Sequence, residues 1–168
     1  QAYQAIDRLH EAGLIYDAHI MTGVAGKGRG MENAEALAQF LNRTNPAHVV
    51  NFSMFLHKEV PLYQDIRQGT FVPADELETI REEYHLIERI APEKAGANIL
   101  YDGFHDFIHV RVRGHLPGDK EKMLAKLNGI IQEYEGKEPV YSFVQGECPD
   151  LEYCDDGKAV WDMDRKTS

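Results

Sequence analysis

The stretch "HIMTGVAGKGRG", which begins at His19, contains the residue types that first suggest chemistry. An apolar segment runs into a loop with four glycines and the cations Lys27 and Arg29. The loop lacks the Lys-Ser or Lys-Thr ending of a Walker A motif, and its glycine order is G-x-x-G-x-G rather than G-x-G-x-x-G. We therefore predict a strand-to-helix turn, which in α/β barrels lies at the functional rim, and we interpret the two cations as solvated turn residues.

The histidines and cysteines do not have the spacing of a metal site or a nucleophile. His105 and His109 are four residues apart in a segment that reads as extended, where such positions lie about 13 Å from each other. The only cysteines, Cys148 and Cys154, fall in an acidic tail, and a pair alone is too few for a closed zinc site. No G-x-S-x-G turn is present either. We predict no bound metal.

Helical and extended segments alternate along the chain. The predicted order is helix 2–12, strand 14–22, helix 31–45, strand 48–57, helix 72–91, strand 106–114 and a last helix with Met123, Leu127, Ile130, Ile131 and Tyr134 on one side. Such alternation is typical of βαβ units with parallel strands. The sequence thus predicts an α/β fold, as a partial barrel or an open sheet with flanking helices.

Two of the predicted strands carry polar residues on one face. In strand 48–57 the face of Val50, Phe52, Met54 and Leu56 is wholly apolar, so we expect it to pack against helices. The other face carries Asn51, Ser53 and Phe55, and strand 14–22 has a comparable face with Asp17, His19 and Met21. Buried polar groups need partners. Two interpretations remain equally supported: a barrel lumen that binds a polar ligand, or polar groups that bond one another inside a structural core.

The composition and charge of the chain argue against some classes of function. The 168 residues carry a formal net charge of -10, with a pI near 5.2, and 43% are hydrophobic. A globular chain of this charge is a poor partner for nucleic acid or an anionic membrane, and we expect neither. Two cysteines are no disulfide framework, so we predict a cytoplasmic protein. We divide the chain into 1–135, which holds the helices and strands, and 136–168, an irregular acidic extension.

Three stretches, in this order, resemble the C-terminal half of a radical S-adenosylmethionine (SAM) enzyme barrel of the Fe-S oxidoreductase type. "RLHEAGLIYDAHIMTGVAGKG" is similar to that family's helix, fifth strand and glycine loop. "TNPAHVVNFSMFLHKEVPLYQDIRQGTFVPADELETIREEYHLIE" is similar to its sixth strand, its Pro-Leu-Tyr turn (Pro61, Leu62 and Tyr63) and the long helix that follows. "HDFIHVRVRGHLPGDKEKML" is similar to its closing segment, through His105, Gly114, Leu116, Pro117, Asp119 and Lys120. The resemblance covers about three quarters of the chain.

The resemblance implies a parent enzyme that uses SAM and a [4Fe-4S] cluster. The family holds the cluster with a C-x3-C-x2-C loop, because thiolates are the ligands that such clusters need. This chain contains no such motif, and it begins in a helical pattern at Gln1. We therefore expect it to be a fragment that binds no cofactor and is inactive alone. Its expected partners are the missing N-terminal half of the barrel or a second copy, paired through open sheet edges.

The resemblance also places candidate site residues. The fifth and sixth strands of such barrels line the cavity for SAM and substrate. Alternate residues of a strand share a face, and on this basis the substrate-cavity positions here are Asp17, His19, Met21 and Phe55. The cofactor-binding positions are Asn51 and Ser53, together with the rim glycines Gly23 and Gly26. Two alternatives to the fragment hypothesis are an independent α/β domain whose glycine loop binds an anion, and a self-associating interaction module.

Overall fold

A computed structural model describes residues 1–105 and 107–144 of the chain. Its main sheet has four strands in the order β1-β2-β4-β5: Asp17–Thr22, His48–Ser53, Ile99–His105 and Val110–Leu116. β1, β2 and β4 are parallel, whereas β5 is antiparallel to β4. A second sheet pairs the short strands β3 (Leu56–His57) and β6 (Phe143–Val144). The fold is thus α/β with an open, mostly parallel sheet.

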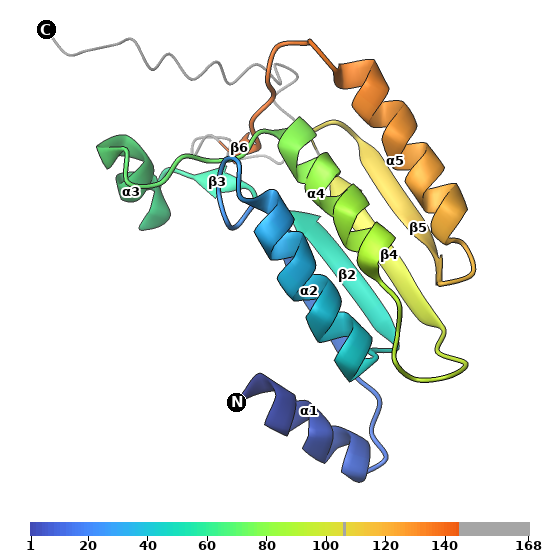
Figure 1. Cartoon of the computed structure of the whole chain (residues 1–168). Helices are drawn as coiled ribbons and strands as arrows, with labels where there is room; N and C mark the ends of the chain where they lie inside the picture. The colour runs from blue at the N-terminus through green and yellow to red at the C-terminus, as the bar shows by residue number, and fades with distance from the viewer. Residues whose placement is uncertain (106, 145–168) are drawn as a thin grey trace, which may run out of the picture.

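Three helices cover one face of the main sheet. α2 (Gly30–Thr44), α4 (Glu76–Arg89) and α5 (Lys120–Tyr134) lie side by side across it in Figure 1. The core between these helices and the sheet is apolar; it includes Leu41, Val49, Ile80, Ile87, Tyr101, Val112 and Leu127. Each large side chain buried there stabilises the fold by about 1.5–3 kcal/mol. α1 (Ala2–Glu11) and α3 (Leu62–Gln68) lie beyond the strand ends.

The predicted βαβ unit is confirmed. β1 and β2 are adjacent and parallel, with Asp17 paired to His48 and Thr22 to Ser53, and α2 connects them. α2 ends where Asn45 takes a left-handed conformation, with φ 45°. α4 begins with a capping box, in which Asp75 accepts the Glu78 backbone N–H and the Glu78 carboxylate accepts the Asp75 N–H.

The prediction for the third strand was wrong in two respects. The segment 106–114 was expected to follow a helix as a parallel strand, but β4 precedes it, and β5 returns from β4 as an antiparallel hairpin. β4 was missed because Asp102 and Gly103 interrupt its apolar alternation. α3 and the β3–β6 pair were missed as well; the remainder of the acidic extension, 145–168, lies outside the described residues.

The assignment of strand faces was also wrong. Val49, Asn51 and Ser53 of β2 are buried beneath the helices, whereas Phe52 is 36% exposed on the opposite face. The alternation of apolar residues, with Val50 and Phe52 on one face, had predicted that this face packs against the helices. Polar residues lie on the covered face because α4 supplies their partners, as described below.

Candidate functional site

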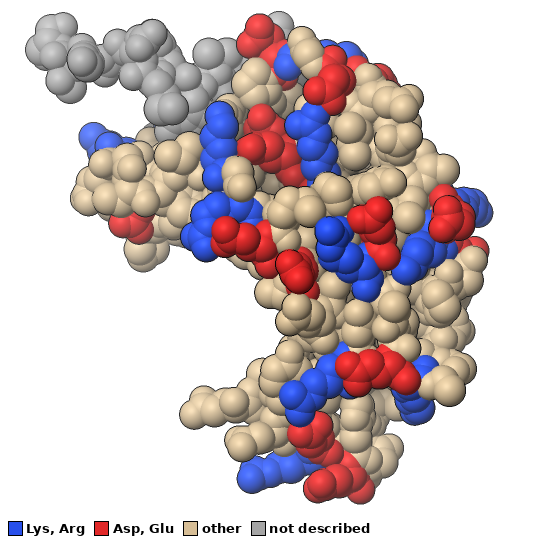
Figure 2. All heavy atoms as spheres, in the orientation of Figure 1, with Lys and Arg blue, Asp and Glu red and all other residues tan. Residues whose placement is uncertain are grey.

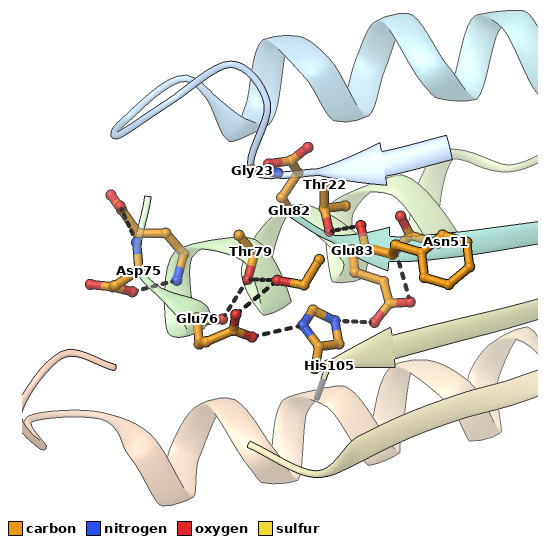
Figure 3. Close-up of polar contacts among 12 residues, drawn as sticks. Thr22, Gly23, Asn51, Asp75, Glu76, Thr79, Glu82, Glu83 and His105 are labelled. Atoms are coloured by element: carbon orange, nitrogen blue, oxygen red, sulfur yellow. Dashed lines mark hydrogen bonds and ion pairs between the residues drawn. The ribbon is translucent and has the colours of Figure 1, made fainter. Parts of the chain in front are cut away.

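Polar side chains gather between α4 and the sheet in a group that we call the α4 cluster. It comprises Glu76, Thr79, Glu82 and Glu83 from α4, Asn51 and Ser53 from β2, and Tyr101 and His105 from β4 (Figure 3). All of these residues are buried. Ionised groups are almost never buried without partners, so the hydrogen bonds of this cluster decide whether the helix can dock on the sheet.

His105 lies between two glutamates. Its Nδ1 is 3.3 Å from Glu76 Oε2, and its Nε2 is 2.9 Å from Glu83 Oε2. Burial alone lowers the pKa of this imidazole, but the hydrogen bonds and charges of the two glutamates outweigh burial and raise its pKa from 6.5 to about 10. His105 is therefore a buried cation at neutral pH, and it ties the N-terminal half of α4 to β4 through Glu76 and Glu83.

Glu83 is the most heavily bonded carboxylate of the cluster. It accepts hydrogen bonds from the Tyr101 hydroxyl at 2.9 Å and from Asn51 Nδ2 at 3.2 Å, besides its contact with His105. Burial and the Glu83 charge hold the pKa of Tyr101 well above its usual range, so the phenol stays a donor. Gly103 makes room for this carboxylate, because a Cβ there would overlap it.

Glu76 and Glu82 bind the other strands. The Ser53 hydroxyl donates to Glu76 Oε1 at 2.8 Å. Glu82 accepts from the Gly23 backbone N–H at 3.0 Å and from Asn33 Nδ2 at 2.5 Å. Burial raises the pKa of Glu82 despite these two hydrogen bonds. Through Glu82 the glycine loop is held directly against α4.

The rim glycines face their own chain. Gly23 and Gly26 have φ values of +85° and +80°, which favour glycine. A Cβ at Gly23 would meet Thr79 Cγ2 at 2.8 Å, and one at Gly26 would meet the Val72 carbonyl oxygen at 2.8 Å. Packing against these neighbours explains both glycines without a ligand, and their predicted role in cofactor binding stays a prediction.

The α4 cluster is a hydrogen-bond network that positions α4 and the glycine loop against the sheet. Two carboxylates, those of Glu76 and Glu83, flank the His105 imidazolium, and Asn51 Oδ1 is buried without a hydrogen-bond partner among the described residues. In residues 1–105 and 107–144 no group of three or more His, Cys, Asp or Glu could hold a metal ion. The cluster is closed to solvent, so its chemistry is structural: it fixes α4 and the glycine loop on β2 and β4.

The face of the sheet opposite the helices carries an ordered set of side chains, which we call the open face. The strand register places Met21, Phe52, Phe104 and Arg111 in one row and His19, Val50, Asp102 and Arg113 in the next. The Phe52 and Phe104 rings are stacked with centroids 5.8 Å apart, and the Arg111 guanidinium lies 4.7 Å from the Phe104 centroid. Partly exposed aromatic rings with a cation beside them can contact planar groups.

Asp102 anchors the cationic end of the open face. Arg111 donates to both of its oxygens, Nε to Oδ1 at 2.8 Å and an Nη to Oδ2 at 2.6 Å, and Arg113 lies 3.7 Å away. The Arg111 hydrogen bonds lower the pKa of Asp102, which therefore remains ionised. Its charge fixes the two arginines over the sheet.

The sequence-predicted site residues do not form one group. Asp17, His19 and Met21 lie on the open face, where the His19 ring is 6.3 Å from that of Phe52. Asn51 and Ser53 point the other way, into the α4 cluster. Phe55 is 56% exposed after the end of β2. The interpretation of one shared polar lumen, which was one of the two left open, is therefore wrong, because the two polar strand faces lie on opposite sides of the sheet.

Sequence reasoning missed the residues that complete both faces. Glu76, Glu83 and Phe104 were not singled out, and His105 was considered only as a metal ligand and as a residue of the family's closing segment. One signal was available: Glu76, Thr79 and Glu83 recur at helical spacing on the buried side of α4, where they match the polar positions of β2.

Comparison with known proteins does not assign the chain to a family. No protein-family model matches the chain, and neither curated proteins nor solved structures give a match. Among the helices of the described residues, none is long and apolar enough to cross a membrane.

Proposed function

We propose that the chain is the C-terminal half of a radical SAM-type α/β barrel, in which its open face forms part of the wall around SAM and substrate. One observation carries the proposal: among residues 1–105 and 107–144, helices cover one face of the sheet only, while His19, Phe52 and Arg111 stand exposed on the other. In a β/α barrel the helices cover the outside and the bare face turns inward. The proposed use of SAM rests on the sequence resemblance.

The structure changes which residues this proposal assigns to the cavity. Asp17, His19 and Met21 keep the substrate-facing position given by the resemblance, and Phe52, Phe104 and Arg111 join them in the neighbouring strands. Asn51 and Ser53 leave the proposed cavity, because their side chains bond Glu83 and Glu76 behind the sheet.

The residues present do not fit a [4Fe-4S] cluster. The family holds its cluster with the three thiolates of a C-x3-C-x2-C loop, because thiolates are the ligands that such clusters need. The chain has two cysteines, Cys148 and Cys154, and both lie outside the described residues. The proposal therefore assigns the cluster and reductive SAM cleavage to an N-terminal half, and this chain is inactive without it.

The alternative of an anion-binding domain has weaker support. Arg29, one of the two loop cations, is paired with Glu32 at 2.7 Å. That contact satisfies the guanidinium locally and leaves Lys27 as the remaining loop cation.

The coding sequence upstream of Gln1 tests the proposal. The proposal expects a reading frame that continues upstream and encodes a C-x3-C-x2-C motif about half a barrel earlier. The longer protein, reconstituted with iron and sulfide, should then release methionine from SAM when a reductant is added, whereas the present chain should release none. An upstream region without the cysteine motif would refute the proposal.

A further inference from the structure

Glu82 is a buried carboxylate that holds the glycine loop, residues 23–29, in place. Its side chain reaches from α4 to the Gly23 N–H, where β1 ends (Figure 3), and its other oxygen accepts from Asn33 of α2. At the surface of the helix-covered side, acidic and basic side chains are interspersed (Figure 2). Glu82 lies beneath that surface with 2% of its area exposed, and both of its hydrogen-bond donors among the described residues are neutral.

The same carboxylate lies at the first residue of α2. This helix begins at Gly30 without a side-chain cap of its own, and a Cβ atom on Gly30 would stand 2.9 Å from Glu82 Oε2. A negative charge at this end of a helix interacts favourably with the helix dipole. Ionised Glu82 therefore stabilises the glycine loop at both of its ends, Gly23 and Gly30.

Protonation of Glu82 weakens one of its two contacts. Oε2 faces the Gly23 N–H and Oε1 faces an N–H of Asn33, so whichever oxygen takes the proton becomes a poorer acceptor for the donor beside it. Asn33 is held in its present orientation, because the same Nδ2 also donates to the Met21 carbonyl at 3.3 Å. The contact with Gly23 has no such second bond at its donor.

The glycine loop is also the partner that moves more readily. Its residues Val24, Lys27 and Arg29 are exposed. Apart from the Gly23 contact and its continuation into α2, one backbone hydrogen bond in the described residues ties it to the rest of the molecule, from the Lys27 N–H to the Val72 carbonyl at 2.8 Å. Exposed segments with few such bonds open at low cost in free energy.

We propose that protonation of Glu82 releases the glycine loop from α4, so that the loop is fixed while this carboxylate is ionised and mobile once it is neutral. Burial raises the pKa of Glu82 from 4.5, so the transition lies above pH 4.5. If the open face lines a cavity, the loop borders that cavity at the end of β1, and its release opens the border. This last consequence alone rests on the proposed function.

The other titratable groups around Glu82 bond elsewhere, and in the described part of the chain none of them hydrogen-bonds Gly23. They are His105 and Tyr101 from β4, Glu76, Glu78, Glu83 and His85 from α4, and the Arg29–Glu32 pair at the start of α2. The charge of Glu82 interacts with His105 and Tyr101. The pKa of His105 is about 10 and that of Tyr101 is well above its usual range, so neither changes its protonation in mild acid.

An NMR titration of the present chain tests the proposal without any substitution. Between pH 8 and pH 4, the Gly23 amide signal should shift with the same midpoint as the Glu82 carboxyl carbon, at a pH above 4.5. Below that midpoint the backbone order parameters of Val24 and Ala25 should fall. Separate midpoints for Gly23 and Glu82, or unchanged order at Val24 and Ala25, would overturn the proposal.

The variant Glu82→Gln imitates the protonated carboxyl, because an amide has one acceptor oxygen. At pH 7 its Gly23 amide should exchange roughly ten- to hundredfold faster than in the wild type, as expected for a lost hydrogen bond to a charged group. The Gly23 signal of this variant should no longer titrate. The control Glu88→Gln, which removes a half-exposed carboxylate from the same helix, should keep both the slow exchange and the titration.

A Gly23 titration that persists in Glu82→Gln would assign the transition to another group and overturn the proposal. The wild-type titration decides the matter even if Glu82→Gln does not fold. Neither measurement uses SAM, so a failure here is distinct from a failure of the longer protein to release methionine.

Discussion

The Glu83 carboxylate occupies the space that a Cβ atom would need at Gly103. Glu83 enters from α4 and Gly103 from β4, so a glycine on the strand admits a charged side chain from the helix. Gly103→Ala should displace this carboxylate from Tyr101 and His105 and lower the free energy of unfolding by about 3 kcal/mol, because a buried charge loses its partners. Urea unfolding at neutral pH measures the change.

Gly129 provides the matched control. It lies in α5, and nothing stands within 4 Å of the position of its Cβ. Gly129→Ala should raise the free energy of unfolding by about 0.5–1 kcal/mol, since alanine favours a helix more than glycine does. Equal effects of the two substitutions would mean that Gly103 matters only for backbone conformation.

Stability should fall in alkaline solution because of His105. Its pKa is raised from 6.5 to about 10, so its contribution is fully present below pH 6.5 and is lost as the pH rises through 10. The raised pKa of Glu82 makes stability fall as the pH rises above 4.5, because the fold favours the protonated carboxyl. The urea midpoint of the wild type should therefore decrease from pH 7 to pH 10.

The variant His105→Gln isolates the contribution of His105 to the pH dependence of stability. At pH 7 this variant should be less stable by about 3 kcal/mol, since Glu76 and Glu83 lose the cation between them. Its urea midpoint should then change less than that of the wild type up to pH 10. A parallel decline in both proteins would show that other groups cause the alkaline loss.

The present chain should bind no iron–sulfur cluster. Its two cysteines are fewer than the three thiolates of the C-x3-C-x2-C loop, and they are spaced C-x5-C. Anaerobic reconstitution with iron and sulfide, followed by desalting, should leave no visible absorption band. A stoichiometric cluster that disappears in the Cys148→Ser/Cys154→Ser variant would contradict this prediction.

The isolated chain should self-associate through β1. Hydrogen bonds from Ala47 to the Tyr16 carbonyl and from Met54 to the Thr22 carbonyl turn the even-numbered residues toward β2. The backbone groups of Asp17 and His19 therefore face the outer edge, where an open strand invites pairing. An antiparallel pair of copies with Asp17 opposite His19 would also place an imidazole beside each carboxylate.

Sedimentation equilibrium at micromolar concentration measures this association. The wild type should be a dimer, and His19→Pro should be a monomer, because proline removes one edge N–H that the sheet itself does not use. Circular dichroism should show that the variant keeps its fold. A wild-type monomer would mean that the β1 edge is blocked within the chain.

Local signals were sufficient for part of the fold. The apolar stripe of α2 and the extended segments around it predicted the β1–α2–β2 unit, which the register of Asp17 and His48 confirms. β4 could not be predicted in the same way, because its two interrupting residues depend on distant partners. Asp102 is held by Arg111 across the hairpin, and Gly103 admits Glu83 from α4.

The candidate site shows the same limit. Asn51 and Ser53 were correctly identified as polar residues in a buried strand, but the sequence of the strand does not say from which side their partners come. Glu83 and Glu76, more than twenty residues away, decide that these side chains face the helix. The interpretation that polar groups bond one another inside a structural core, which the sequence left open, describes this pair correctly.

The release of methionine from SAM by the longer protein tests the central claim most directly. After reconstitution and reduction, we expect release from the wild type and a large loss in Phe52→Asp, which places a charge in the middle of the open face. Val60→Asp, a change at an exposed apolar residue outside that face, should keep most of the activity. No release from the wild type, or full release from Phe52→Asp, would contradict the proposal that the open face lines the cavity.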